Sequence, residues 1–208
     1  MRIIKIDIFL LIVLTPIYLI SQTNPLNDDW RWIRFTTEYG LPSNRVMNIC
    51  ETKKGTIWAN TQLGLAWFNG YHWEAIGKSK GLFPRMMSLI LADERDSILV
   101  IIDERLYYGG QNGFRHIPFY IGGKEKKVGS AAYLGDNSFL LISNSHLYVL
   151  KNDSIKSYDV PDYLKAVEIY YSWNTNGGSI WLNTSDGLYR MQGEAWSLKL
   201  KKDKSVFE

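Results

Sequence analysis

A hydrophobic pattern that returns every 41 residues constrains the fold of this chain more than any other feature. Trp58 and Trp181 lie 123 residues apart, which is three times 41, and an isoleucine precedes each of them. A leucine recurs at another position of all four repeats, as Leu65, Leu106, Leu147 and Leu188. Self-similarity at a fixed period is typical of repeat architectures, in which each repeat is one supersecondary unit. The chain is therefore expected to contain four copies of the same unit.

Each repeat is expected to form four short strands. In the first repeat, stretches rich in apolar residues lie at 46–51, 56–61, 65–69 and 72–76. The breaks between them carry turn residues, among them Asn69-Gly70, and Asn-Gly between two strands is a strong hairpin signal. Equivalent turn residues recur at Asp96, Asn137, Gly177-Gly178, Ser185-Asp186-Gly187 and Gln192-Gly193. Repeats of this length with four antiparallel strands are typical of β-propeller blades.

The predicted fold is therefore all-β, with four consecutive four-stranded blades. We place the blades at residues 36–77, 78–118, 119–159 and 160–200, followed by a tail at 201–208. The 8 Trp and 13 Tyr agree with this assignment, because aromatic residues favour strands. Stacked blades cover both faces of each sheet, so Trp58 and its equivalents are interpreted as core residues. A sustained helical period is absent from the chain after the first 22 residues.

Residues 1–22 have the order of a secretory signal peptide. Arg2 and Lys5 give a positive start, residues 8–20 are almost wholly apolar, and Ser21 offers a small residue for cleavage. An uncleaved N-terminal anchor is the alternative interpretation. Both interpretations predict export, with the rest of the chain on the periplasmic or extracellular side of the inner membrane.

Several short sequence motifs resemble the two-component-regulator propeller repeat. In the first repeat they are Leu41-Pro42-Ser43-Asn44-Arg45-Val46, Ile57-Trp58 and Gly64-Leu65, and in the fourth they run from Ile180 to Leu188. The second and third repeats keep only the apolar skeleton. Asn60 and Asn183 stand where that family usually has glycine.

The resemblance implies the extracytoplasmic, ligand-sensing part of a hybrid histidine kinase or related regulator. It implies a small-molecule or oligosaccharide ligand, and it implies the remaining blades and signalling domains of a parent sensor as partners. The alternative function is a stand-alone exported binding or scaffold propeller without a signalling partner.

The N-terminal segment suggests that blades are missing. Residues 23–35 are expected to form a linker and a closing strand, because Trp32 lies 41 residues before Trp73 of the fourth strand in the first blade. The fourth repeat already has its own last strand around Trp196. We therefore expect the chain to be an N-terminal part of a seven-bladed ring, as in the family it resembles, and propellers have roughly 4–8 blades. A closed four-bladed ring with a redundant first strand is the alternative.

Strand direction predicts where a ligand would bind. The loop that leads into a blade and the turn between its second and third strands emerge at the same end of the sheet. The candidate ligand-binding residues are Asn44, Arg45 and Gln62 in the first repeat and Tyr170, Tyr171, Ser185 and Asp186 in the fourth. The tyrosines break the repeat phase and could stack on a sugar ring. The alternative for Asn44 is that it only satisfies backbone groups of its turn.

The sequence gives no positive evidence for catalysis, a metal or a cofactor. The three histidines, His72, His116 and His146, lack metal-ligand spacing, and no catalytic or phosphate-binding motif occurs. The net charge of +3 is spread along the chain, so nucleic acid is not an expected partner. A membrane is expected to be reached only through the leader or a downstream segment. Cys50, the single cysteine, is interpreted as a core residue that forms no internal disulfide.

Overall fold

The computed structural model describes residues 33–175, 177–193 and 195–202. The chain divides into two parts, Met1–Arg34 and Phe35–Glu208, and all of the sheets belong to the second part. The leader predicted at residues 1–22 and most of the closing strand predicted at 23–35 lie outside the described residues. Residues 33–36 are described and form no strand.

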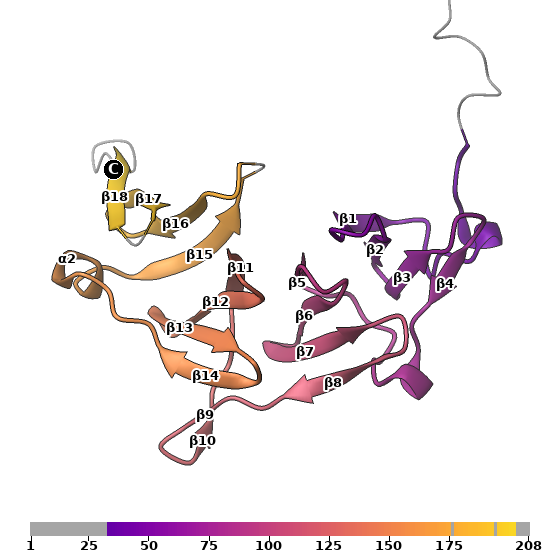
Figure 1. Cartoon of the computed structure of the whole chain (residues 1–208), viewed down its shortest axis with the longest axis horizontal. Helices are drawn as coiled ribbons and strands as arrows, with labels where there is room; N and C mark the ends of the chain where they lie inside the picture. Colours follow the sequence, from indigo (N-terminus) through magenta and orange to yellow (C-terminus); the bar gives the residue numbers. More distant parts are fainter. Residues whose placement is uncertain (1–32, 176, 194, 203–208) are drawn as a thin grey trace, which may run out of the picture. The chain divides into compact units, whose positions relative to one another are not determined.

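The second part contains four antiparallel sheets of four strands each, with the strands of each sheet in chain order (Figure 1). Blade 1 contains β1 (Val46–Glu51), β2 (Ile57–Thr61), β3 (Gly64–Phe68) and β4 (Trp73–Ala75). Blade 2 contains β5 (Leu89–Ala92), β6 (Ile98–Ile102), β7 (Arg105–Gly110) and β8 (Gly113–Ile117). Blade 3 contains β11 (Ser130–Gly135), β12 (Ser138–Ser143), β13 (His146–Lys151) and β14 (Ser154–Ser157). Blade 4 contains β15 (Ile169–Asn174), β16 (Ile180–Thr184), β17 (Gly187–Gln192) and β18 (Ala195–Lys201). The predicted all-β fold with four four-stranded blades is confirmed.

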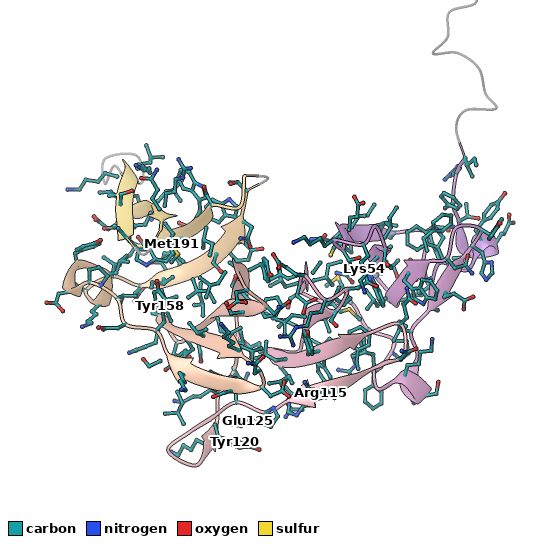
Figure 2. All side chains as sticks on the ribbon, in the orientation of Figure 1. Lys54, Arg115, Tyr120, Glu125, Tyr158 and Met191 are labelled. Carbon is teal, nitrogen blue, oxygen red and sulfur yellow. The ribbon has the colours of Figure 1, made fainter. Side chains whose placement is uncertain are left out.

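Short elements occupy the segments that lead into the blades. The 3₁₀ helices η3 (Thr37–Tyr39) and η4 (Lys78–Lys80) precede blades 1 and 2, and the one-turn helix α2 (Asp162–Lys165) precedes blade 4. A small hairpin of β9 (Tyr120–Ile121) and β10 (Lys124–Glu125) precedes blade 3, and Figure 2 labels Tyr120 and Glu125 on it. The sequence did not predict this hairpin, because strands of two residues are too short to show a period.

Neighbouring positions in each strand face opposite neighbouring blades, as expected when side chains alternate along a strand. Ile98 of β6 packs into the core shared by blades 1 and 2, whereas the next residue, Leu99, packs into the core shared by blades 2 and 3. A third core, which contains Leu140 and Ile180, joins blades 3 and 4. The first strands of successive blades also contact one another, β1 with β5, β5 with β11 and β11 with β15. The 41-residue period is therefore the period of blade-on-blade packing.

Two sheet faces in the series stay open. On blade 1, Ile49 is 63% and Ile57 is 36% exposed, although the isoleucines one repeat later, Ile90 and Ile98, are buried. On blade 4, Trp181 is half-buried, although Trp58, three repeats earlier, is 0% exposed. These residues keep the phase of the repeat, but no blade among the described residues covers them. Their exposure follows from their place at either end of the series.

Cys50 is expected to resist alkylation while the chain is folded. The thiol packs against the core between blades 1 and 2, and burial raises its pKa to about 11. Because the thiolate is the nucleophile, only roughly one thiol in a thousand would be ionised at about pH 8. Iodoacetamide should therefore modify the folded chain roughly 100-fold more slowly than the urea-unfolded chain, as followed by mass spectrometry. Equal rates in the two states would contradict the packing of this side chain.

Candidate functional site

The predicted ligand-binding residues fall into two groups. Arg45 and Gln62 meet beside the beginning of β1, where the backbone N–H of Gln62 donates to the carbonyl of Arg45 at 3.0 Å. Ser185 and Asp186 lie in the turn between β16 and β17, and Tyr170 lies on β15. Blades 2 and 3 stand between the two groups in the series. The structure therefore offers two small polar clusters for these residues, one on blade 1 and one on blade 4.

In the blade 1 cluster, Asn44 is engaged by its own loop. Its Oδ1 atom accepts a hydrogen bond from the backbone N–H of Thr37 at 2.7 Å, which favours the structural role considered for it. Asn60, where the resembling family has glycine, is 2% exposed and pairs with the backbone of Met87. Its Nδ2 atom donates to the Met87 carbonyl at 2.8 Å, and its Oδ1 atom accepts from the Met87 N–H at 3.3 Å. This asparagine thus ties blade 1 to the segment that leads into blade 2.

In the blade 4 cluster, Glu168 connects the predicted residues. Its backbone N–H donates to Ser185 Oγ at 3.1 Å, and its carboxylate accepts from the hydroxyl of Tyr170 at 3.1 Å. That hydrogen bond raises the pKa of Tyr170. Asp186 accepts from the hydroxyl of Tyr189 at 3.2 Å. A groove of about 340 Å³ adjoins the cluster and is lined by Tyr170, Asn183, Thr184, Gly187, Leu188, Leu200, Lys201 and Lys202.

Tyr171 belongs to a ladder of flat side chains on the open face of blade 4. Its ring stacks on Trp173 at 6.3 Å, and Trp173 stacks on Trp181 at 6.2 Å with only 12° between the planes. The guanidinium of Arg190 lies 6.0 Å from the Trp181 ring. Ser172, which alternates with these residues, points the other way and hydrogen-bonds to Ser130 of blade 3. The ladder therefore presents an aromatic surface away from blade 3.

The sequence missed a groove of about 280 Å³ between blades 2 and 3. It is lined by Arg95, Tyr108, Arg115, Asn137, Phe139, Leu150, Asn152 and Asp153. Arg95 and Asn137 lie in turns between first and second strands, and Asn152 and Asp153 lie in a turn between third and fourth strands, so the groove is at the opposite end of the sheets from the predicted loops. Figure 2 labels Arg115 on β8.

The polar wall of this groove is built by both blades. Arg115 of blade 2 forms an ion pair with Asp153 of blade 3 at 2.5 Å, and its guanidinium lies 5.6 Å from the Tyr108 ring. The Tyr108 hydroxyl donates to the buried carboxylate of Asp93, and burial, followed by this hydrogen bond, raises the pKa of Tyr108. Asp93 also accepts from the backbone N–H of Arg95 at 2.8 Å. The groove thus has a fixed set of donors and acceptors.

One pattern in the sequence could have indicated this groove. Arg115 and Asp153 are 38 residues apart, which is close to one repeat, with Arg115 on β8 and Asp153 in the turn before β14. Between blades 3 and 4, the side chain of Asn174 likewise meets a residue one repeat earlier, but it pairs with the backbone N–H and carbonyl of Tyr133, 41 residues away. A polar side chain about one repeat away from a possible partner therefore indicates a contact across two blades.

Within the described ranges, no cluster of three or more His, Cys, Asp or Glu residues could hold a metal ion. His72 lies 2.7 Å from Glu74, and His116 lies 3.7 Å from Glu125. The part of the chain that the structure describes also contains no helix long and apolar enough to cross a membrane.

No protein-family model matches the chain, and no curated protein matches it. Solved structures do resemble it. The extracellular domain of the hybrid two-component system BT4673 from B. thetaiotaomicron is 17% identical over 78% of this chain, with a TM-score of 0.53. A virginiamycin B lyase from Staphylococcus aureus is 12% identical over 73% of this chain, with a TM-score of 0.53. YCF48 from Cyanidioschyzon merolae is 14% identical over 77% of this chain, also with a TM-score of 0.53.

The matches cover only part of each neighbour. The chain spans 22% of the two-component structure, 54% of the lyase and 57% of YCF48. The neighbours thus include extracellular domains as well as a lyase, and their shared feature with this chain is the architecture. At these identities the likeness establishes the fold, which is that of consecutive β-propeller blades.

Proposed function

We propose that this chain is an extracytoplasmic ligand-sensing propeller module of a two-component signal transduction regulator. The observation that carries the proposal is the likeness, over 78% of the chain, to the extracellular domain of a hybrid two-component system. The sequence motifs of the first and fourth repeats support it, because they resemble the same class of sensor. The proposed role is non-catalytic, and a small molecule or an oligosaccharide is the proposed ligand.

The way the blades are joined suggests how such a module would respond. The groove between blades 2 and 3 takes residues from both sheets, and the cluster of Arg115, Tyr108 and Asp153 crosses their boundary. A ligand can shift a conformational equilibrium only by binding one state better than the other. A ligand that bridges two blades would favour the arrangement in which they are packed together, and it would thereby bias the signalling output.

In-frame deletion of the codons for residues 23–208 in the native host tests this function. The deletion is expected to abolish the transcriptional response to one compound in a panel of carbohydrates and sugar acids while growth on glucose is unchanged. RNA sequencing after each substrate is added provides the readout, and a chromosomal copy of the intact gene provides the control. An unchanged response to every substrate would contradict the sensor role and favour the exported scaffold. Recovery of the chain in the cytoplasmic fraction would contradict its export.

A further inference from the structure

The groove between blades 2 and 3 has rigid walls. Asp136 and Asn137, between β11 and β12, have φ of 49° and 50°, and Asn152 and Asp153, between β13 and β14, have φ of 48° and 63°. Two-residue hairpin turns with both central residues at positive φ are tightly fixed by the strands they join. Tyr108 lies on β7 of the neighbouring blade. A site held by strands and tight turns loses little conformational entropy when a ligand binds.

The groove carries an excess of positive charge. Two guanidinium groups, those of Arg95 and Arg115, line it together with one carboxylate, that of Asp153. Arg115 is paired with Asp153, whereas Arg95 forms no ion pair among the described residues. The formal charge of the lining side chains is therefore +1. The Asp93 carboxylate lies behind this lining, where it is buried and accepts hydrogen bonds from the Tyr108 hydroxyl and from the backbone N–H groups of Arg95 and Ser97. A guanidinium fork matches a carboxylate or phosphate, and the single excess charge favours a ligand with one negative charge.

One residue that lines the groove also carries an acceptor without a donor. The Oδ1 atom of Asn137 is buried and finds no hydrogen-bond partner among the described residues. A buried polar atom without a partner costs about 1–3 kcal/mol, and a ligand donor that reaches Oδ1 after a rotation of the Asn137 side chain would recover this cost. A hydroxyl group is a neutral donor that fits beside two guanidinium groups, whereas an ammonium group would be repelled by them.

The floor of the groove is apolar. Phe139 is 2% and Leu150 is 4% exposed, and both belong to the core that joins the two blades. The ring of Tyr108 stands beside them in the lining. Such a floor suits the carbon skeleton of a ligand. The volume of about 280 Å³ lies just below the usual range of ligand pockets, so it suits a molecule of about six carbons.

We propose that this groove binds a small hydroxylated monocarboxylate. The carboxylate lies between Arg95 and Arg115, and the carbon skeleton rests on Phe139. A hydroxyl donates to Asn137 Oδ1 once that side chain has rotated toward the ligand. The inference rests on the proposed function, because we take this monocarboxylate to be the ligand that the sensor module detects. Its test measures binding alone, so a failure to bind and a failure to signal are separate results.

Three compounds with six-carbon skeletons separate the contributions to binding. Gluconate has both a carboxylate and hydroxyls, sorbitol has the hydroxyls alone, and hexanoate has the carboxylate alone. Calorimetric titration of the full exported chain should give a Kd for gluconate below about 1 mM. Sorbitol and hexanoate should each bind at least about 10-fold more weakly, because each lacks one of the two polar interactions. No binding of gluconate up to about 20 mM, or equal binding of sorbitol, would overturn the proposal.

Matched variants locate the site. Arg95→Gln removes the unpaired charge without breaking an ion pair. Asn137→Asp places a negative charge beside the negatively charged ligand, and it breaks no hydrogen bond of Oδ1, since that atom has no partner among the described residues. Each should weaken gluconate binding about 10-fold or more, with unfolding temperatures within a few degrees of the parent chain. Arg85→Gln is the control, because Arg85 pairs with Asp103 at the other end of blade 2. Unchanged affinity in both groove variants, or an equal loss in the control, would show that the anion does not bind in this groove.

Discussion

Replacement of Trp58 by alanine should destabilise the chain by about 3–5 kcal/mol, because it would leave a large cavity in a closed core. Trp58 is 0% exposed, and its ring meets Phe114 of blade 2 edge-on at 6.0 Å. Its Nε1 atom has no hydrogen-bond partner among the described residues, so the loss comes from packing. The unfolding temperature should fall by roughly 10 °C, as measured by circular dichroism.

Trp181 offers a matched control, because it stands at the same position of the fourth repeat. It is only half-buried and contacts Trp173 and Arg190 on the open face of blade 4. Trp181→Ala should therefore cost only about 1 kcal/mol. An equal loss in the two variants would contradict the difference in burial and would indicate that the face of blade 4 is covered in solution.

The same pair of tryptophans shows why the fold could be predicted from the sequence. A gap-free register places Ile57 and Trp58 on opposite faces of one strand, and their equivalents Ile98 and Leu99 enter two different cores. Such a register is possible only if every blade repeats the same strands and turns. In the first blade, the first predicted strand, 46–51, coincides with β1, and the fourth predicted strand, 72–76, contains β4. The apolar repeat in the sequence thus predicts directly which positions are buried.

The geometry of the groove between blades 2 and 3 cannot be predicted from the repeat in this way. Arg95 lies in a turn and Arg115 on a strand of blade 2, at different phases of the repeat, and they line one groove with Asn137 and Asp153 only because blade 3 packs on blade 2. The polar end of a blade is not under the alternation that fixes its core, so turn residues vary from repeat to repeat. The residues proposed from the sequence, such as Gln62 and Asp186, remain a prediction for the same reason. Repeated sequence motifs indicate where loops emerge, but not which of the loops form a groove.

Replacement of Gly81 by alanine, which adds only a methyl group, should also destabilise the chain strongly. It ends η4 with φ of +83°, and a Cβ atom there would lie 2.1 Å from the carbonyl oxygen of Phe114. Gly40, one repeat earlier, would place a Cβ atom 2.0 Å from the carbonyl oxygen of Trp73. Because these obstacles are backbone atoms of β4 and β8, they cannot move without disturbing the sheet. Gly81→Ala should therefore cost about 3 kcal/mol, from overpacking together with the positive φ.

Gly122 separates the two contributions, since it stands at the same position of the third repeat. Its φ is +58°, but a Cβ atom there would meet nothing within 4 Å, because the β9–β10 hairpin replaces the close approach. Gly122→Ala should therefore lose only the conformational part, about 1 kcal/mol. Urea unfolding of both variants measures the difference. Equal losses would show that backbone conformation alone selects glycine, whereas a larger loss at Gly81 would show that contact with the last strand of the blade selects it. In that case the recurring glycine fixes where each 3₁₀ turn rests on the blade that follows it.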